Sequence, residues 1–236
     1  PRLNRFGETK AVRTLLAPRS GRDGGPTGLI TPRHVQPGEI DDALLEDVKL
    51  AVVAGAAGPN GSVEPLRRFV ERGGRLLIAA GGDFDPAEWT RAAWLDGHGI
   101  LPAPLGGAFG RLPDDPGRLD PFLLDVASLR DEPLFRLAGL PEEEFLELYE
   151  TPIFFRAVET DVAAGEAAAA EAAAAEVAAA ERETAASGDP RAEDDRPQPE
   201  DSPPRVLARF TGGQPFIVAK RIGAGEVVWI ASGLFS

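Results

Sequence analysis

Two continuous apolar runs lie near the middle of the chain, at residues 50–54 and 76–80. Runs of this length without polar alternation are typical of strands buried on both faces. The stretch between them repeats apolar residues at helical spacing, at Val63, Leu66, Phe69 and Val70. This order predicts two parallel strands joined by a crossover helix. We expect a core that includes Val52, Val53, Phe69, Leu77, Ile78, Val228 and Ile230.

Glycine-rich loops follow both predicted strands and lead into helices. After residues 55–61, Ser62 is placed to cap the crossover helix over 63–72. After Gly81 and Gly82, Asp85 is placed to cap a second helix over 86–94.

Weaker patterns precede this unit. Residues 8–17 have helical apolar spacing and end at Pro18, and a glycine-rich loop follows at 21–28. We expect a short strand over 29–31 and a brief helix over 41–47, capped by Asp41 or Asp42.

Three short apolar segments at 206–210, 216–220 and 226–231 are joined by glycine-containing turns. Short connections of this kind favour an antiparallel meander. Residues 97–160 form a long segment rich in Pro and Gly, in which we expect a buried strand at 153–155. This segment forms either a cap over the end of the sheet or a surface flap. The predicted fold class is therefore α/β: a mainly parallel sheet flanked by helices, with a C-terminal antiparallel meander.

The charge of the chain is concentrated in one segment. The chain has 236 residues and a net charge of −13, and residues 163–204 hold eleven acids and three bases, which is −8 of that total. Residues 163–186 are Ala-rich with a Glu at every fifth position up to 181, a pattern that favours a helix without a broad apolar stripe. Residues 187–204 are acidic and Pro-rich.

We therefore predict a single α/β domain over 1–162 and 205–236, interrupted by a low-complexity acidic insertion over 163–204. The insertion is either a tolerated expansion of a surface loop or a partner-binding segment. Deletion of 165–202 should leave the domain folded.

Composition excludes several function classes. The acidic balance argues against nucleic-acid binding, and the chain lacks Cys, so cysteine nucleophiles and disulfides are excluded. His34 and His98 are the only histidines, so we expect no multi-histidine metal site and no cofactor. No 18-residue apolar run exists, so we expect no membrane insertion by this segment. The chain starts without Met and contains none, which suggests a piece of a longer chain.

Candidate ligand positions lie in the two loops that follow the central strands. Ligands of open α/β sheets bind outside the carboxyl ends of the strands, where helix N-termini offer N–H groups. Neither loop contains a G-x-G-x-x-G or a Walker A motif, so both could equally be plain turns. The candidate ligand-binding residues are Gly55, Asn60, Gly61, Ser62, Gly81, Gly82, Asp83 and Asp85.

A hydrolytic alternative uses Asp83, Asp85 and His98, because paired carboxylates and a lone histidine can serve as acid and base. It requires the three side chains to converge in one pocket. The simpler interpretation makes Asp85 a helix cap, Asp83 a turn residue and His98 a loop residue. The G-x-S-x-G motif is absent.

Several stretches together carry a family resemblance: residues 49–54, 66–78, 99–106, 213–216 and 221–228. They resemble the glutamine-amidotransferase-like domain of large bacterial membrane-associated proteins, which often also carry a von Willebrand factor A module. The resemblance implies a flavodoxin-like layer in a soluble part of such a protein. It does not imply the activity, because the turn after residues 76–80 has no Cys and Ala231-Ser232-Gly233 replaces the His-x-Glu pair.

Two functions remain open beside the hydrolase. The leading hypothesis is a non-catalytic interaction or scaffold module of a larger envelope-associated protein, whose partner is another protein or another domain of the same parent chain. The alternative is a small-ligand or sugar-binding domain that uses the loops at 55–62 and 81–85.

Overall fold

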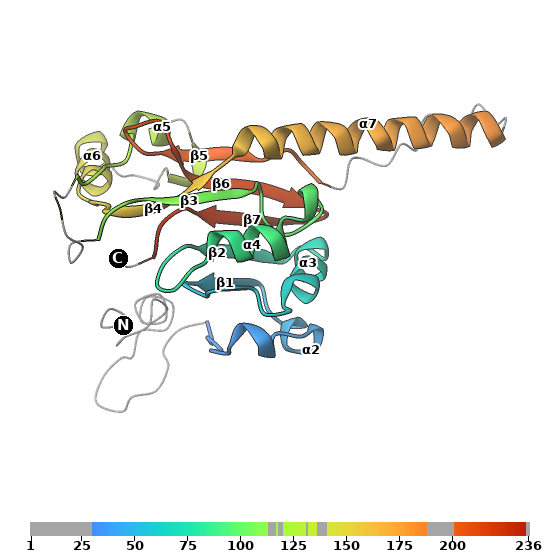
Figure 1. The fold of residues 1–236 in the computed structure, drawn as a ribbon, viewed down its shortest axis with the longest axis horizontal. Coiled ribbons are helices and arrows are strands. Elements are labelled where there is room, and N and C mark those ends of the chain that lie inside the picture. Colours follow the sequence, from blue (N-terminus) through green and yellow to red (C-terminus); the bar gives the residue numbers. More distant parts are fainter. Residues whose placement is uncertain are drawn as a thin grey trace.

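The computed structural model describes residues 30–112, 117, 120–130, 132–135, 141–187 and 201–234. Its centre is a five-stranded mixed sheet in the order β1-β2-β7-β6-β5 (Figure 1). The strands are β1 (Leu50–Ala54), β2 (Arg75–Ala79), β5 (Arg205–Arg209), β6 (Pro215–Ile222) and β7 (Gly225–Ile230). The chain is thus α/β, as the sequence predicts, but the sheet is mixed rather than mainly parallel, because two of its strand pairs are parallel and two are antiparallel.

The predicted crossover is confirmed. β1 and β2 are parallel neighbours with Val52 opposite Leu77, and α3 (Val63–Glu71) connects them. The C-terminal meander is confirmed as well, because β5, β6 and β7 pair antiparallel. β7 then pairs in parallel with β2, so the meander completes the central sheet.

One face of the sheet carries the hydrophobic core. Val53, Ile78, Trp229 and Val218 lie side by side across four strands and are all buried. Helices α3 and α4 (Pro86–Ala93) belong to this face, which we call the covered face. The ring of Phe84, just before α4, lies 5.3 Å from that of Trp229 and 5.3 Å from that of Trp89, so it packs between strand and helix.

The opposite face is less covered than the sequence predicts. We call it the open face and define it by Leu50, Val52, Leu77, Val228 and Ile230. Leu50 is 46% exposed, the other four are only partly buried, and Val52 and Leu77 lie outside the contiguous core. The expectation that β1 and β2 are buried on both faces is therefore wrong, although Val53, Phe69 and Ile78 are buried as predicted. The helices that follow β1 and β2 both pack on the covered face, which accounts for the difference.

A two-stranded antiparallel sheet, β3 (Leu105–Gly110) and β4 (Arg156–Thr160), lies within the excursion over 97–160. The indole Nε1 of Trp229 donates a buried hydrogen bond of 2.9 Å to the Thr160 hydroxyl, which joins β4 to the covered face. The strand expected at 153–155 begins later, at Arg156, and Ile153 is exposed. Phe154 instead forms an isolated bridge with Phe122 inside a cluster of aromatic rings.

The remaining short elements are η2 (Pro37–Glu39), α2 (Asp42–Leu45), η3 (Leu95–Gly97), α5 (Val126–Arg130), η4 (Pro133–Phe135) and α6 (Glu142–Glu150). The helix near 41–47 is confirmed, and the Asp41 carboxylate accepts from the Leu44 amide. Ile30 and Thr31 form no strand, while Leu29, the helix over 8–17 and the loop at 21–28 lie outside the described residues.

The Ala-rich segment forms α7 (Val162–Ser187), which projects beyond the body of the molecule (Figure 1). Its first turn is anchored: a Cβ on Gly165 would lie 2.8 Å from the Pro102 carbonyl oxygen and 3.0 Å from Ala103 Cβ. Residues 170–177 are all exposed. Within the described part of the chain, no helix is long and apolar enough to cross a membrane.

The chain returns to the body before the predicted end of the insertion. Asp201 bridges to Ile222, and the amide of Ser202 donates to the Arg221 carbonyl at 3.0 Å. Pro204 is buried. Both ends of the predicted insertion therefore contact the folded body, at the base of α7 and along β6.

Candidate functional site

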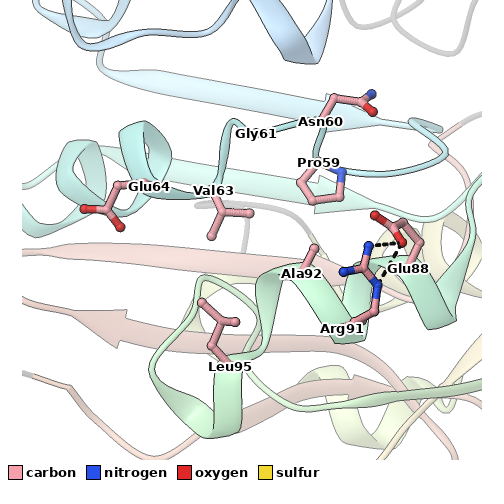
Figure 2. Close-up of a pocket in the computed structure, with 9 residues that line it drawn as sticks. All are labelled: Pro59, Asn60, Gly61, Val63, Glu64, Glu88, Arg91, Ala92 and Leu95. Carbon is pink, nitrogen blue, oxygen red and sulfur yellow. Dashed lines mark hydrogen bonds and ion pairs between the residues drawn. The ribbon is translucent and has the colours of Figure 1, made fainter.

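A groove of about 390 Å³ lies between the loop after β1 and helix α4, within the size range of small-molecule sites. It lies between the start of α3 and helix α4 (Figure 2). Its lining residues are Pro59, Asn60, Gly61, Val63, Glu64, Glu88, Arg91, Ala92 and Leu95.

The loop that forms one wall depends on unusual backbone angles. Asn60 and Gly61 have φ values of 47° and 85°, a region that favours Gly and tolerates Asn. Ser62 is buried, and its hydroxyl donates to the Pro59 carbonyl at 2.6 Å. The expectation that Ser62 caps α3 is therefore wrong: its hydroxyl closes the loop, and α3 begins without a side-chain cap.

The loop and α4 are fixed to each other. The indole Nε1 of Trp89 donates to the Ala56 carbonyl at 2.8 Å, and the amide of Asp85 donates to the Ala57 carbonyl at 3.1 Å. Trp89 is fully buried, so its hydrogen bond is shielded from water. The two walls of the groove thus form one packed unit.

The groove has an apolar floor and a charged rim. Pro59, Val63, Ala92 and Leu95 supply apolar surface, and Leu95 is 50% exposed. On the rim, Arg91 pairs with Glu88 at 2.5 Å (Figure 2). Glu64 points away to Arg68 at 2.8 Å. These ion pairs are exposed and contribute little to stability. They nevertheless place carboxylate hydrogen-bond acceptors and one guanidinium group on the rim of the groove.

The structure brings only some of the predicted ligand residues together. Asn60 and Gly61 line the groove, whereas Gly55 and Ser62 belong to the same loop but do not. The second predicted loop lies outside it: Gly81, Gly82, Asp83 and Asp85 do not line the groove.

Asp85 has the structural role that the simpler interpretation gives it. Its carboxylate accepts from the amides of Ala87 at 3.0 Å and Glu88 at 3.2 Å, which caps α4. Asp83 is an exposed turn residue, and His98 is exposed beyond the far end of α4. The eight residues of α4 alone separate these positions by about 12 Å. The three groups of the hydrolytic alternative are thus not assembled, and the described residues contain no cluster of three His, Cys, Asp or Glu that could hold a metal ion.

Sequence reasoning missed a buried charged cluster beside the groove. Lys220 on β6 is only 4% exposed, and its Nζ donates to the Gly97 carbonyl at 2.6 Å. Asp201 Oδ2 lies 3.5 Å from Lys220 Nζ and 3.4 Å from Arg67 Nη2. Burial lowers the pKa of Lys220, and the Asp201 carboxylate opposes that shift. The available signal was Lys220, which directly follows the apolar run at 216–219 and is therefore expected to lie within the same strand.

Comparison with known proteins assigns no function to the groove or to the charged cluster. We find no protein-family model that matches the chain and no curated protein that is similar to it.

Proposed function

We propose that this protein is a non-catalytic α/β interaction module that binds another polypeptide through its open face. The observation that carries the proposal is the apolar row Val52–Leu77–Val228, which crosses three strands and is only partly buried. Contiguous apolar surface of this kind on a folded protein marks an interaction site more often than chance exposure does.

The border of the open face supports a protein partner. At one end of the strands, Arg75, Glu226 and Arg221 form a row of alternating charge across β2, β7 and β6. An apolar centre bordered by charged groups is the usual arrangement of a protein interface. The partner is another protein or another domain of the parent chain. The family resemblance adds that the parent is a large envelope-associated bacterial protein.

Site-specific photo-crosslinking tests this function. A benzoylphenylalanine at position 77 or 52, incorporated in the cells that naturally produce the protein, should capture the same polypeptide at both positions. Leu148 is the matched control, since it is 48% exposed but lies on α6. Val228→Asp, verified as folded by circular dichroism, should abolish the product. Equal crosslinking at 77 and 148 would show that the open face is not a binding surface.

The groove supports a second candidate function, small-ligand binding. The favouring observation is that Asn60 and Gly61, predicted from sequence as ligand residues, line a groove with an apolar floor and polar rim. Glucose, galactose and N-acetylglucosamine are suitable first probes in a thermal-shift experiment. A ligand at 100 times its dissociation constant should add about 2.7 kcal/mol to the unfolding free energy. Ala92→Trp, which fills the groove, should remove the shift, and the absence of any shift with these sugars would exclude them as ligands.

A further inference from the structure

The turn that ends the groove has a backbone conformation that requires support. Leu95, Asp96 and Gly97 have consecutive φ values of 50°, 54° and 91°. Residues other than Gly rarely adopt this left-handed region, and two in succession persist only where surrounding contacts enforce them. Leu95, the first of the three, lines the groove (Figure 2).

Two cations from different elements hold the carbonyl groups of this turn. Lys220 on β6 donates to the Gly97 carbonyl at 2.6 Å, and Arg67 on α3 donates to the carbonyls of His98 and Gly99, the latter at 3.1 Å. Charge-assisted hydrogen bonds of this kind are stronger than neutral ones, especially when shielded from water. The turn is therefore fixed from the sheet and from a helix at once.

Asp201, the first described residue after α7, joins the two cations. Its Oδ2 is within 3.5 Å of both Lys220 Nζ and Arg67 Nη2. The base of α7 also reaches the turn, because a Cβ on Gly97 would lie 3.0 Å from Ala168 Cβ. The base of α7 thus contacts the turn directly, and Asp201 contacts it through Lys220 and Arg67.

We propose that Asp201, where the chain returns to the body after α7, is a latch that holds residues 95–97 in their left-handed conformation through Lys220 and Arg67 and thereby sets the end of the groove. Without the Asp201 carboxylate, Lys220 loses its carboxylate partner, Arg67 keeps only Glu71 at 2.9 Å, and the repulsion between the two cations is no longer offset. The turn can then relax, and Leu95 moves with it. The latch itself does not depend on the groove binding a ligand; only its consequence for ligand affinity rests on that second proposed function.

Amide hydrogen exchange of the full chain tests the latch. Asp201→Asn should speed exchange of the Gly97, His98 and Gly99 amides at least tenfold relative to amides of β2, and Lys220→Met should do the same. The matched control is Asp42→Asn. The Asp42 carboxylate pairs with Arg68, which lies beside Arg67 on α3, but it does not contact the turn.

A second substitution separates the latch from general destabilisation. Gly fits the φ of 54° at position 96, so Asp96→Gly should restore slow exchange at 97–99 in the Asp201→Asn background. Exchange at 97–99 that is unchanged in both the Asp201→Asn and Lys220→Met variants would overturn the proposal. Uniformly faster exchange, with β2 rising as much as the turn, would also overturn it. Neither result would bear on sugar binding, which the thermal-shift experiment measures separately.

Discussion

Two adjacent leucines on β2 occupy opposite environments. Leu76 is 1% exposed on the covered face, whereas Leu77 is only partly buried on the open face. Leu76→Ala should lower the unfolding free energy by about 2–5 kcal/mol, because it leaves a cavity in a closed core. Leu77→Ala should cost less than about 2 kcal/mol, since water already reaches this position. Urea denaturation of both variants measures the difference, and equal losses would mean that the open face is packed in the isolated chain.

A second residue pair tests the cap of α4. Asp85→Ala should cost about 0.5–2 kcal/mol because two amides lose their acceptor. Asp83→Ala, two residues earlier and exposed, should change stability by less than about 0.5 kcal/mol. Thermal unfolding distinguishes the two. Equal effects would contradict the cap and reopen a joint role for both carboxylates.

The buried Lys220 should give the protein a specific dependence on alkaline pH. Its folded-state pKa is lowered from 10.5, mainly by burial. Between the folded and unfolded pKa values the unfolded chain therefore binds more protons, and stability contributed by this group rises with pH across that window. Below the folded pKa, its destabilising effect is constant. Lys220→Met should remove the alkaline rise, which urea denaturation at several pH values measures; an identical slope in both proteins would contradict it.

Residue-level burial could be predicted only in part. Val52 and Val53 are the same residue type in the same apolar run, yet only Val53 is buried. Which face of a strand is covered depends on the direction in which later helices cross the sheet, and the local run carries no information on this. The cap at Asp85 was predictable because it depends on neighbours within three residues.

At the scale of elements, local sequence patterns predicted the strands and helices whose packing partners lie nearby in the sequence. The β1–α3–β2 unit and the meander both have short connections, and both are confirmed. The strand β4 was predicted too early in the chain. Phe154 packs in the aromatic cluster, and residues 156–160 pair with β3 instead. That choice is made by tertiary contacts.

The contact between β4 and the central sheet includes one buried side-chain hydrogen bond, from the Trp229 indole to Thr160, beside the backbone bond from the Val158 amide to the Ala231 carbonyl at 2.8 Å. Thr160→Val keeps the shape of the side chain but leaves the Trp229 indole N–H without its acceptor. We expect a loss of about 1–3 kcal/mol, the penalty for an unsatisfied buried donor. Thr160→Ser retains the hydroxyl and should cost less. If valine is tolerated as well as serine, the bond does not join the two sheets.

At the scale of the whole molecule, the groove and the charged cluster bring together residues distant in sequence. Arg67 and Asp201 are 134 positions apart, and Lys220 comes from a third element. The spacing of these three residues along the chain does not indicate that their side chains form one cluster. The loop at 55–62 could be predicted because it directly follows a strand. The second wall of the groove, formed by Glu88 and Ala92 of α4 and by Leu95 of η3, could not.

We expect the fold to require only the two anchored ends of the predicted acidic insertion over 163–204. Residues 170–177 are exposed, so deletion of 170–200, closed by a flexible Gly-Ser linker, should leave the unfolding free energy nearly unchanged. The sequence alone predicts that deletion of 165–202 costs little stability, but the structure changes this expectation: the deletion should destabilise the domain, because it removes the packed Gly165 and leaves Lys220 buried without Asp201. Loss of one partner from a buried ion pair costs about 3–5 kcal/mol in closed interiors, and the partial exposure of Asp201, 25%, places the expected loss below that range.

Urea denaturation of the two deletions side by side measures the contrast. If both are equally stable, the anchors at 165 and 201 do not hold the insertion to the body; if the shorter deletion unfolds, the exposed part of α7 has a structural role that its surroundings do not indicate.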